Sequence, residues 1–213
     1  EEALWCPSDG IVDTQRLVWR LWQDLLGRGV RFGFQADGTV REVKGDAETG
    51  VKGGFEVSVG ADSWLAAPVL VNAAGAWAGQ VARSLGCATF PVQPMRRHVF
   101  VTAAFRPRLK LPIVWDVTNE IYLRPDGEAL MMSPCDEEAQ TPGPSGVSDA
   151  ARELLEKKLQ SFFPAALGTK HVKIWSGLRT FSKDRKFVIG WDFIQKNLFW
   201  TACLGGYGVT VAA

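Results

Sequence analysis

The spacing of apolar positions along the chain predicts two amphipathic helices. After Asp13 or Thr14, either of which can cap a helix, apolar residues recur at helical spacing as far as Gly27. A second pattern of this kind follows Ser148 or Asp149 and stops before Pro164. The two predicted apolar stripes comprise Leu17, Val18, Leu21, Trp22 and Leu25 in the first helix, and Ala151, Leu154, Leu155, Leu159, Phe162 and Phe163 in the second.

Strands and one short helix are predicted between residue 31 and about residue 90. Extended pieces at residues 31–35 and 39–44 precede residues 55–59, where apolar and polar positions alternate as in a half-buried strand. Residues 68–71 form a continuous apolar run, which is typical of a strand covered on both faces. That run leads into Asn72-Ala-Ala-Gly-Ala-Trp77 and then into the short helix.

The remainder of the chain has the pattern of an antiparallel sheet with one helix. Short strand-like segments are joined by turns such as Pro125-Asp-Gly127. The fold class is therefore predicted to be α+β, with an α/β portion followed by an antiparallel-sheet domain. The expected strands lie at residues 99–103, 113–116, 120–124, 129–133, 171–178, 187–191 and 198–202.

Composition limits the function classes without selecting one. Lys and Arg number 24 against 23 Asp and Glu, so the net charge of +1 provides no field that would attract nucleic acid or an anionic membrane. A hydrophobic fraction of 46% excludes general disorder. A length of 213 residues suits one large domain or two small ones. Nine Trp against two Tyr is unusual, and such rings fill cores or line ligand pockets.

Cysteine and histidine spacing favours free thiols over a metal site. No two of the four cysteines form a C-x-x-C pair, and neither histidine has a cysteine neighbour, so we expect no zinc site and no disulfide framework. These thiols indicate a reducing compartment, and we expect a cytoplasmic location. The residues concerned are Cys6, Cys87, Cys135, Cys203, His98 and His171.

Neither a membrane span nor a signal peptide is expected. The uncharged stretch at residues 63–82 is interrupted by proline, asparagine and glycine, and a buried strand followed by a helix explains it better. The first residues, Glu-Glu-Ala-Leu-Trp-Cys-Pro, contain no basic region and no initiator Met, so they are expected to be neither a signal peptide nor a natural start.

Four short segments are candidates for chemistry, and each has a simpler alternative. The strand and small residues at 69–77 would let a ligand approach backbone amides at a helix N-terminus, or they form a tight turn without a ligand. Arg179, at the end of an apolar strand, would hold a carboxylate, or it pairs with Asp184 on the surface. Residues 203–210 contain glycines whose backbone would let a ligand approach closely, although a glycine-rich turn alone is weak evidence of a binding site. Pro94-Met-Arg-Arg-His98 would bind phosphate, or it is a solvated strand entry.

Three of these segments, in this order, resemble the D-amino-acid oxidase (DAO) family of FAD-dependent oxidoreductases, which includes glycine oxidase and sarcosine oxidase. They are Val71-Asn-Ala-Ala-Gly-Ala-Trp77, Trp175-Ser-Gly-Leu-Arg179 and Leu204-Gly-Gly-Tyr-Gly-Val-Thr210. Together they span most of the chain. The resemblance implies that FAD is the cofactor and that the partner is a small-molecule amino acid or amine. The cysteine and histidine spacing and the net charge predict neither a metal site nor a nucleic-acid partner. It leaves the oligomeric state open.

The resemblance also implies a role for individual residues. Arg179 would bind the substrate carboxylate, and Tyr122 would stand on the substrate side of the flavin ring. The family chemistry removes a hydride from the carbon beside an amine, flavin N5 accepts it, and the resulting imine hydrolyses. The implied cofactor-binding residues are Val40 near the adenine, Ala73, Ala74, Gly75 and Trp77 along the FAD, and Gly205, Gly206, Tyr207, Gly208 and Val209 at the isoalloxazine end.

The sequence departs from the family pattern in ways that limit these expectations. Thr180, Cys203 and Tyr207 replace the usual Pro, Gly and His. The 213 residues contain no G-x-G-x-x-G. We therefore expect a C-terminal portion of such an enzyme, with weak or no FAD binding by this chain alone. The expected parts are residues 1–90 and 176–213 in the FAD lobe and residues 91–175 in the substrate domain. The alternative is a non-catalytic binding or assembly module that keeps the family fold.

Overall fold

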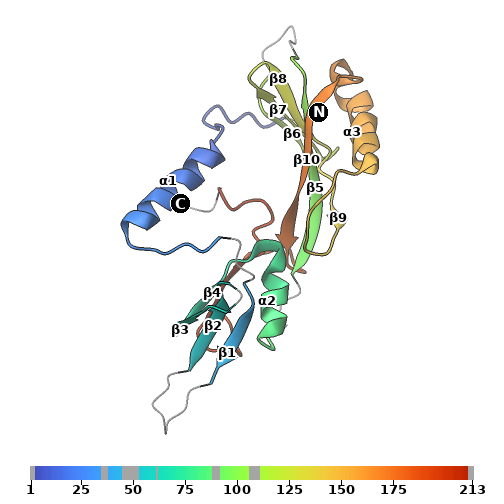
Figure 1. Ribbon diagram of the computed structural model, residues 1–213. Coiled ribbons are helices and arrows are strands. Elements are labelled where there is room, and N and C mark those ends of the chain that lie inside the picture. The colour runs from blue at the N-terminus through green and yellow to red at the C-terminus, as the bar shows by residue number, and fades with distance from the viewer. Residues whose placement is uncertain are drawn as a thin grey trace.

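The computed structural model describes residues 3–34, 38–44, 53–60, 62–87, 92–105 and 111–210. Within these ranges the chain forms three sheets and three α-helices (Figure 1). The expected domain limit at residue 90 lies outside the described residues, and the division into lobes stays a prediction.

An antiparallel sheet forms the larger half of the molecule. Its strands run in the order β10-β5-β8-β7-β6, and β9 pairs with the free part of β5. Alternation along each strand gives the sheet one apolar face, because successive side chains point to opposite sides. The strands are β5 (Gln93–Thr102), β6 (Val114–Asp116), β7 (Ile121–Asp126), β8 (Ala129–Ser133), β9 (Glu138–Ala139) and β10 (His171–Phe181).

Helix α3 (Asp149–Phe162) covers the apolar face of this sheet, as Figure 1 shows, and η2 (Pro164–Ala166) follows it. Leu155 and Leu159 from the helix are fully buried against Phe100 and Met132 from the sheet. The predicted position of this helix is confirmed, and all of its predicted apolar stripe except Leu154 packs in this core. Among the described residues, no helix packs on the opposite face of the sheet, which contains Arg179.

Two three-stranded sheets and a short helix form the smaller half. One sheet has the order β1-β2-β3 and is antiparallel, and the other has the order β11-β12-β4, in which β12 and β4 are parallel. Helix α2 (Ala78–Ser84), which follows the 3-10 turn η1 (Gly75–Trp77), packs against both through Ala78 and Ala82. The strands are β1 (Val40–Val43), β2 (Gly54–Ser58), β3 (Trp64–Ala67), β4 (Leu70–Asn72), β11 (Val188–Trp191) and β12 (Leu198–Ala202).

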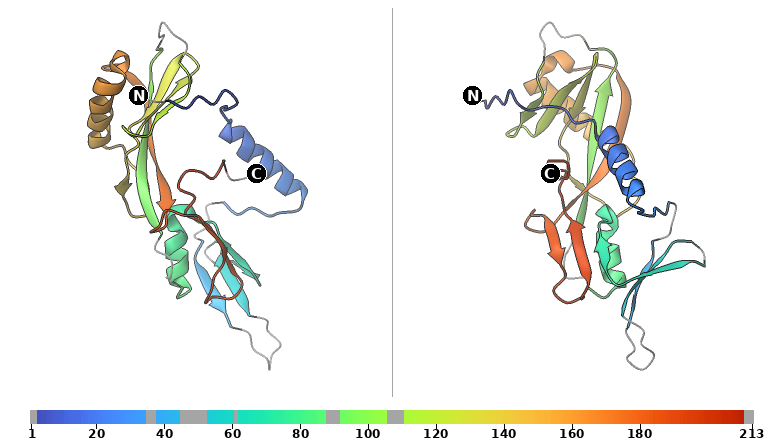
Figure 2. Two further views of the ribbon diagram at one scale, coloured as in Figure 1. Left: turned by 180° about the vertical axis from the view of Figure 1, so that it is seen from behind. Right: turned by 90° about the vertical axis from the view of Figure 1, so that its left-hand side faces the viewer.

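Helix α1 (Thr14–Gly27) forms where predicted, but it packs differently from the prediction. Asp13 caps it by accepting a hydrogen bond from the backbone N–H of Arg16 at 3.0 Å. None of its residues is buried, and Figures 1 and 2 show it set apart from the sheets. An amphipathic pattern predicts a helix, whereas burial of its stripe also requires a neighbouring surface.

Several strand predictions need correction. Residues 31–34 form no strand, and Gln35 lies outside the described residues. The run at residues 68–71 was expected to be covered on both faces, but Val71 is 56% exposed because nothing in the described chain packs on that face of β4. Neither β3 nor β9 was predicted, and the strand predicted at residues 99–103 begins earlier, at Gln93.

The four cysteines are free thiols. In the described part of the chain, no group of three or more histidine, cysteine and acidic side chains is placed so that it could hold a metal ion. None of the helices there has the length and apolar character that crossing a bilayer requires.

Candidate functional site

Two turns leave the smaller half of the molecule from one edge of a sheet. Strands β4 and β12 are parallel, with Val71 opposite Phe199 and Asn72 opposite Trp200. Both strands therefore end at the same edge, where the turns at residues 73–77 and 203–209 begin. Ligands of α/β sheets bind outside the carboxyl ends of the strands. The topology thus brings together two of the segments singled out in the sequence.

Asn72 shapes the first of these turns. Its side chain is buried, Nδ2 donates to the carbonyl of Ala78 at 3.0 Å, and Oδ1 accepts from the N–H of Ala74 at 3.3 Å. Gly75 has a φ of +54°, in the left-handed region that favours glycine. These contacts hold a strand-to-helix turn whose outer surface is made of small residues.

A hollow of about 550 Å³ lies over this turn. Its wall is mostly backbone and small side chains, so a flat ligand can approach the main chain closely. Leu178, next to Arg179, closes one side, which places the end of β10 beside the first turn. The lining residues are Ala73, Ala74, Gly75, Ala76, Trp77, Gly143, Ser145 and Leu178.

The second turn packs directly against Arg179. Gly206 has a φ of +96°, and a methyl group added there would lie 2.7 Å from Cζ of Arg179. The preceding Gly205 donates its N–H to the carbonyl of Thr180 at 3.0 Å. Glycine at 206 is therefore what allows the guanidinium to lie against the backbone. The second and third family-like segments therefore meet here, and Leu178 of the second also borders the hollow over the first turn.

Arg179 carries a charge that no described residue pairs. It is half-buried and forms no hydrogen bond or ion pair within the described ranges. Burial lowers the pKa of its guanidinium, and the nearby charge of Arg97 lowers it further. The alternative pairing with Asp184 is not found: that carboxylate accepts from Ser182 Oγ at 2.8 Å and from the N–H of Lys186 at 3.2 Å. Such a cation is suited to bind an anion.

Tyr122 lies on the same face of the large sheet as Arg179, three strands away. Its position on β7 pairs with Ser133 on β8, and this face is the one that α3 leaves uncovered. The hydroxyl is half-buried, and burial raises its pKa, so it stays protonated at neutral pH. Cys135 lies close enough to interact electrostatically with both Tyr122 and Arg179. The two residues proposed for the substrate side thus share one surface.

The other proposed cofactor residues lie at different depths. The side chain of Val40 is buried against α2, so it faces the core of the smaller half. Tyr207 is exposed, with its N–H donating to the carbonyl of Leu204 at 2.7 Å and its ring 6.4 Å from that of Phe187. Gly208 and Val209 continue the same turn, and the roles of all four stay predictions.

The segment at residues 94–98 is not a solvated strand entry, because His98 is fully buried. Its Nε2 accepts from the N–H of Ser148 at 3.0 Å, so Nδ1 carries the proton toward Asp136 Oδ2, 2.7 Å away. Arg97 points to the opposite face and binds Glu137 at 2.9 Å. The alternation of a strand predicts opposite faces for neighbours, but it does not identify these distant partners.

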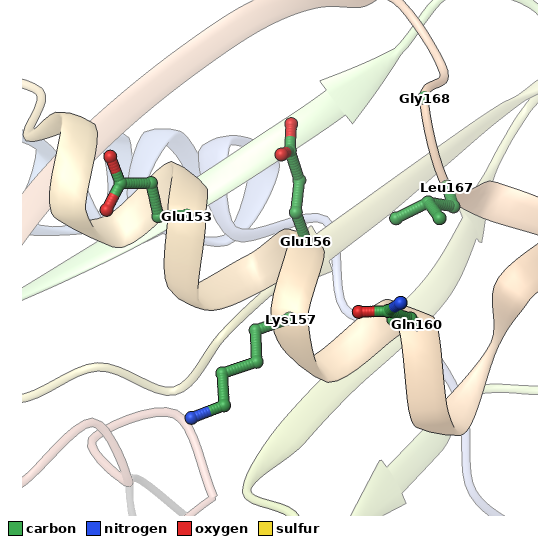
Figure 3. Close-up of a pocket in the computed structure, with 6 residues that line it drawn as sticks. All are labelled: Glu153, Glu156, Lys157, Gln160, Leu167 and Gly168. Carbon is green, nitrogen blue, oxygen red and sulfur yellow. The ribbon is translucent and has the colours of Figure 1, made fainter.

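A second hollow, of about 460 Å³, lies on the outer side of α3 (Figure 3). Helix α3 covers the other face of the large sheet, so this hollow is remote from Arg179. Its side chains carry charges of both signs, and it includes no residue singled out in the sequence. The lining residues are Glu153, Glu156, Lys157, Gln160, Leu167 and Gly168.

Comparison with known proteins identifies relatives of the whole chain. A family model described as FAD dependent oxidoreductase (DAO) matches residues 1–213. The chain is 29% identical over 161 residues to FAD-dependent oxidoreductase domain-containing protein 1 from Bos taurus, covering 68% of this chain and 33% of that protein. It is 26% identical over 228 residues to mitochondrial dimethylglycine dehydrogenase from Rattus norvegicus, covering 97% of this chain and 25% of that protein.

Solved structures share the fold. Glycine oxidase from Geobacillus kaustophilus matches with a TM-score of 0.61 and 22% identity, over 75% of this chain and 42% of that one. Iminodiacetate oxidase from Chelativorans sp. BNC1 matches with a TM-score of 0.68 and 18% identity, over 93% of this chain and 51% of that one. The chain therefore spans a quarter to a third of these curated relatives and about half of these structures. The alternative of a non-catalytic module finds no support among them.

Proposed function

Because the chain belongs to the DAO family of FAD-dependent oxidoreductases, we propose that it supplies the substrate site and the flavin-facing turns of an amino-acid or amine oxidoreductase. The observation that carries this proposal is the unpaired guanidinium of Arg179, which lies against the backbone of Gly206 in the second turn. A cation held there, next to exposed backbone, suits a small carboxylate that must lie close to a flat ring.

The residues at this edge fit a flavin. Gly206 leaves no room for a side chain between the backbone and Arg179, and the first turn presents only small residues and Trp77 to the hollow. We propose that Ala73, Ala74, Gly75 and Trp77 line the FAD, with residues 205–209 at its isoalloxazine end and Val40 toward its adenine. When bound, FAD supplies the acceptor of a hydride from the carbon beside the substrate nitrogen.

The residues of this chain then bind and orient the substrate. Arg179 would hold the carboxylate through two parallel hydrogen bonds, which fixes the adjacent carbon relative to the sheet. The protonated hydroxyl of Tyr122 can donate a hydrogen bond from the same face. The half-buried position of Arg179 strengthens its interaction with the carboxylate, because water screens the pair less than it would at the surface.

Replacing Arg179 tests the proposal. In the FAD-loaded full-length enzyme, Arg179→Ala should raise KM for an amino-acid substrate by a factor equivalent to about 2–5 kcal/mol, which is the usual cost of removing one partner of a buried charge pair. Arg152→Ala is a matched control, because Arg152 lies near His171 on the α3 side of the sheet. An unchanged KM in Arg179→Ala, measured by steady-state kinetics, would remove Arg179 from the substrate site.

We also propose that the protein resides in a reducing compartment such as the cytoplasm. The support is that its four cysteines are free thiols, two of them buried.

A further inference from the structure

Glu137 lies between two arginines next to the proposed substrate site. It follows β8, in the loop that leads to β9. Its Oε1 accepts from Arg97 Nη2 at 2.9 Å, and Arg185 contributes Nη1 at 3.3 Å to Oε1 and Nη2 at 2.5 Å to Oε2. The carboxylate is 24% exposed and the side chain of Arg97 is 15% exposed, so this pair is only partly screened by water. One carboxylate therefore engages two guanidinium groups.

Both arginines are committed to these contacts. Arg97 also donates Nη2 to the carbonyl of Cys135 and Nε to that of Asp136, each at 3.2 Å. The guanidinium of Arg185 lies 4.7 Å from the ring centroid of Phe181. Their donors are thus directed to the loop, to Glu137 and to an aromatic ring. Among these three arginines, only Arg179 makes no hydrogen bond within the described structure.

The charges of the group nevertheless act on one another. Burial lowers the pKa of Arg179, the charge of Arg97 lowers it further, and the charge of Glu137 opposes this effect. The hydrogen bond from Arg185 lowers the pKa of Glu137, against the opposing effect of burial, and the charges of Arg97 and Arg179 add to the lowering. Glu137 is therefore ionised at neutral pH. It lies close to Arg179, because its partner Arg97 stands opposite Gly177 on β10, two residues from Arg179 and on the same face of the sheet.

We propose that Glu137 is a specificity-determining residue that restricts the site to substrates with a single carboxylate. It holds the donors of Arg97 and Arg185, so Arg179 is left to bind one carboxylate. Without the Glu137 charge, two further guanidinium groups would be available beside Arg179, and a second carboxylate would be attracted to them. This inference rests on the proposed function of Arg179 as the carboxylate-binding residue.

Glu138 provides a matched control in the next position of the chain. It pairs with Arg96, which neighbours Arg97 on β5 but points to the opposite face of the sheet. Arg96 also donates Nη1 to the carbonyl of Gly146 at 3.1 Å. Glu138→Gln thus removes one carboxylate, as Glu137→Gln does, and frees one guanidinium instead of two, on the side away from Arg179. A general effect of charge or stability would appear in both variants.

The experiment measures binding of acetate and malonate to the FAD-loaded full-length enzyme by isothermal titration calorimetry. Glu137→Gln should raise the affinity for malonate relative to acetate by about tenfold, since one negative charge is removed next to the site. Glu137→Asp should keep the wild-type ratio, and Glu138→Gln should leave it unchanged. An equal ratio in Glu137→Gln and wild type would overturn the specificity role.

A second variant keeps the test decisive if Glu137→Gln fails to fold. Arg185 has a side chain that is 60% exposed, so Arg185→Gln should be tolerated. It removes one positive charge and should lower the ratio of the affinity for malonate to that for acetate, whereas an unchanged ratio would contradict the inference.

Arg179→Ala separates the two proposals. If it leaves acetate binding intact, the proposed function fails. If it weakens acetate binding while the Glu137 and Arg185 variants keep the wild-type ratio, only the specificity role fails.

Discussion

Gly206 and Arg179 occupy adjoining space, and only a residue without a side chain fits between the turn and the guanidinium. The φ of +96° at Gly206 is unfavourable for any other residue, and the nearest atoms of Arg179 lie 2.7 to 2.9 Å from where a Cβ would stand. A side chain at this position would displace the guanidinium, because the competing atoms belong to a side chain that can move.

Gly206→Ala should therefore weaken substrate binding more than it weakens the fold. We expect KM to rise by about tenfold or more, since a displacement of about 1 Å in a binding group can cost that much. Gly127→Ala is a suitable control, because Gly127 also has a positive φ, +61°, but its Cβ would meet open space in the turn between β7 and β8. Both variants should lose some thermal stability, and only the first should change KM. Equal KM values would contradict the role of this contact.

For single residues, the sequence predicted a site role only where the residues lie near one another in the chain or belong to family-like segments. Arg179 and Gly206 were both singled out, and the structure brings them into contact. Glu137 was not, because its partners at positions 97 and 185 are distant in sequence and no local pattern identifies them. A charged residue on a loop is most often solvated, so only the three-dimensional arrangement distinguishes it.

The elements of the larger half are joined by a buried histidine. His98 on β5 receives the N–H of Ser148, which precedes the first residue of α3, and is bound to Asp136 in the loop after β8. The backbone N–H of His98 also donates to Asp136, at 2.9 Å. This single side chain links a strand, a loop and the start of a helix, and the same loop carries Glu137.

His98→Ala should destabilise the protein by roughly 3 kcal/mol or more, because a largely buried carboxylate would lose a hydrogen-bond partner and a cavity would form. Urea denaturation monitored by circular dichroism measures the change in unfolding free energy. His171→Ala is the comparison, since His171 is only partly buried and its polar contact, with Arg152, is longer, at 3.3 Å. A loss in His98→Ala no greater than that in His171→Ala would contradict this role.

The periodicity of the sequence predicted whether most elements are helices or strands. It did not predict which strands pair or which faces are buried, because these depend on contacts between residues distant in the sequence. The antiparallel segments and α3 were predicted, because strong alternation and a clear helical stripe specify them locally. Strand β3 (Trp64–Ala67) was not, since its apolar run lacks alternation and it forms by pairing with β2. The apolar stripe of α1 correctly predicted a helix, but this stripe is exposed because no other element of the described chain packs on it.

At the scale of the whole molecule, the chain combines a sheet covered by one helix with a second region whose sheet edge carries the turns at residues 73–77 and 203–209. The larger half has a continuous core between α3 and the sheet. The smaller half has a core around α2, but several large side chains on its outer surface are exposed, such as Trp191 at 59% and Ile189 at 57%. Large exposed apolar surface of this kind marks sites of further contact.

A protein made of these 213 residues alone should bind FAD weakly or not at all. The sequence contains no G-x-G-x-x-G turn, and that turn provides the backbone amides which bind the pyrophosphate of the cofactor. The absorbance spectrum of the purified chain after incubation with FAD and gel filtration measures retention. A stoichiometric flavin spectrum would contradict the expectation and would show that the turns at residues 73–77 and 203–209 suffice.

The parallel pairing of β4 with β12 also sets the order in which the chain can be assembled. Leu70 pairs with Leu198, so more than half of the 213 residues separates the two partners. During synthesis β4 leaves the ribosome before β12 and cannot complete this ladder until β12 has been made. The strands that form the large sheet, β5 to β10, all emerge in the interval. Closing so long a loop is slow and entropically costly, and it is less so once the intervening chain is already compact. The edge from which the turns at residues 73–77 and 203–209 leave is therefore completed only after β12 has been translated.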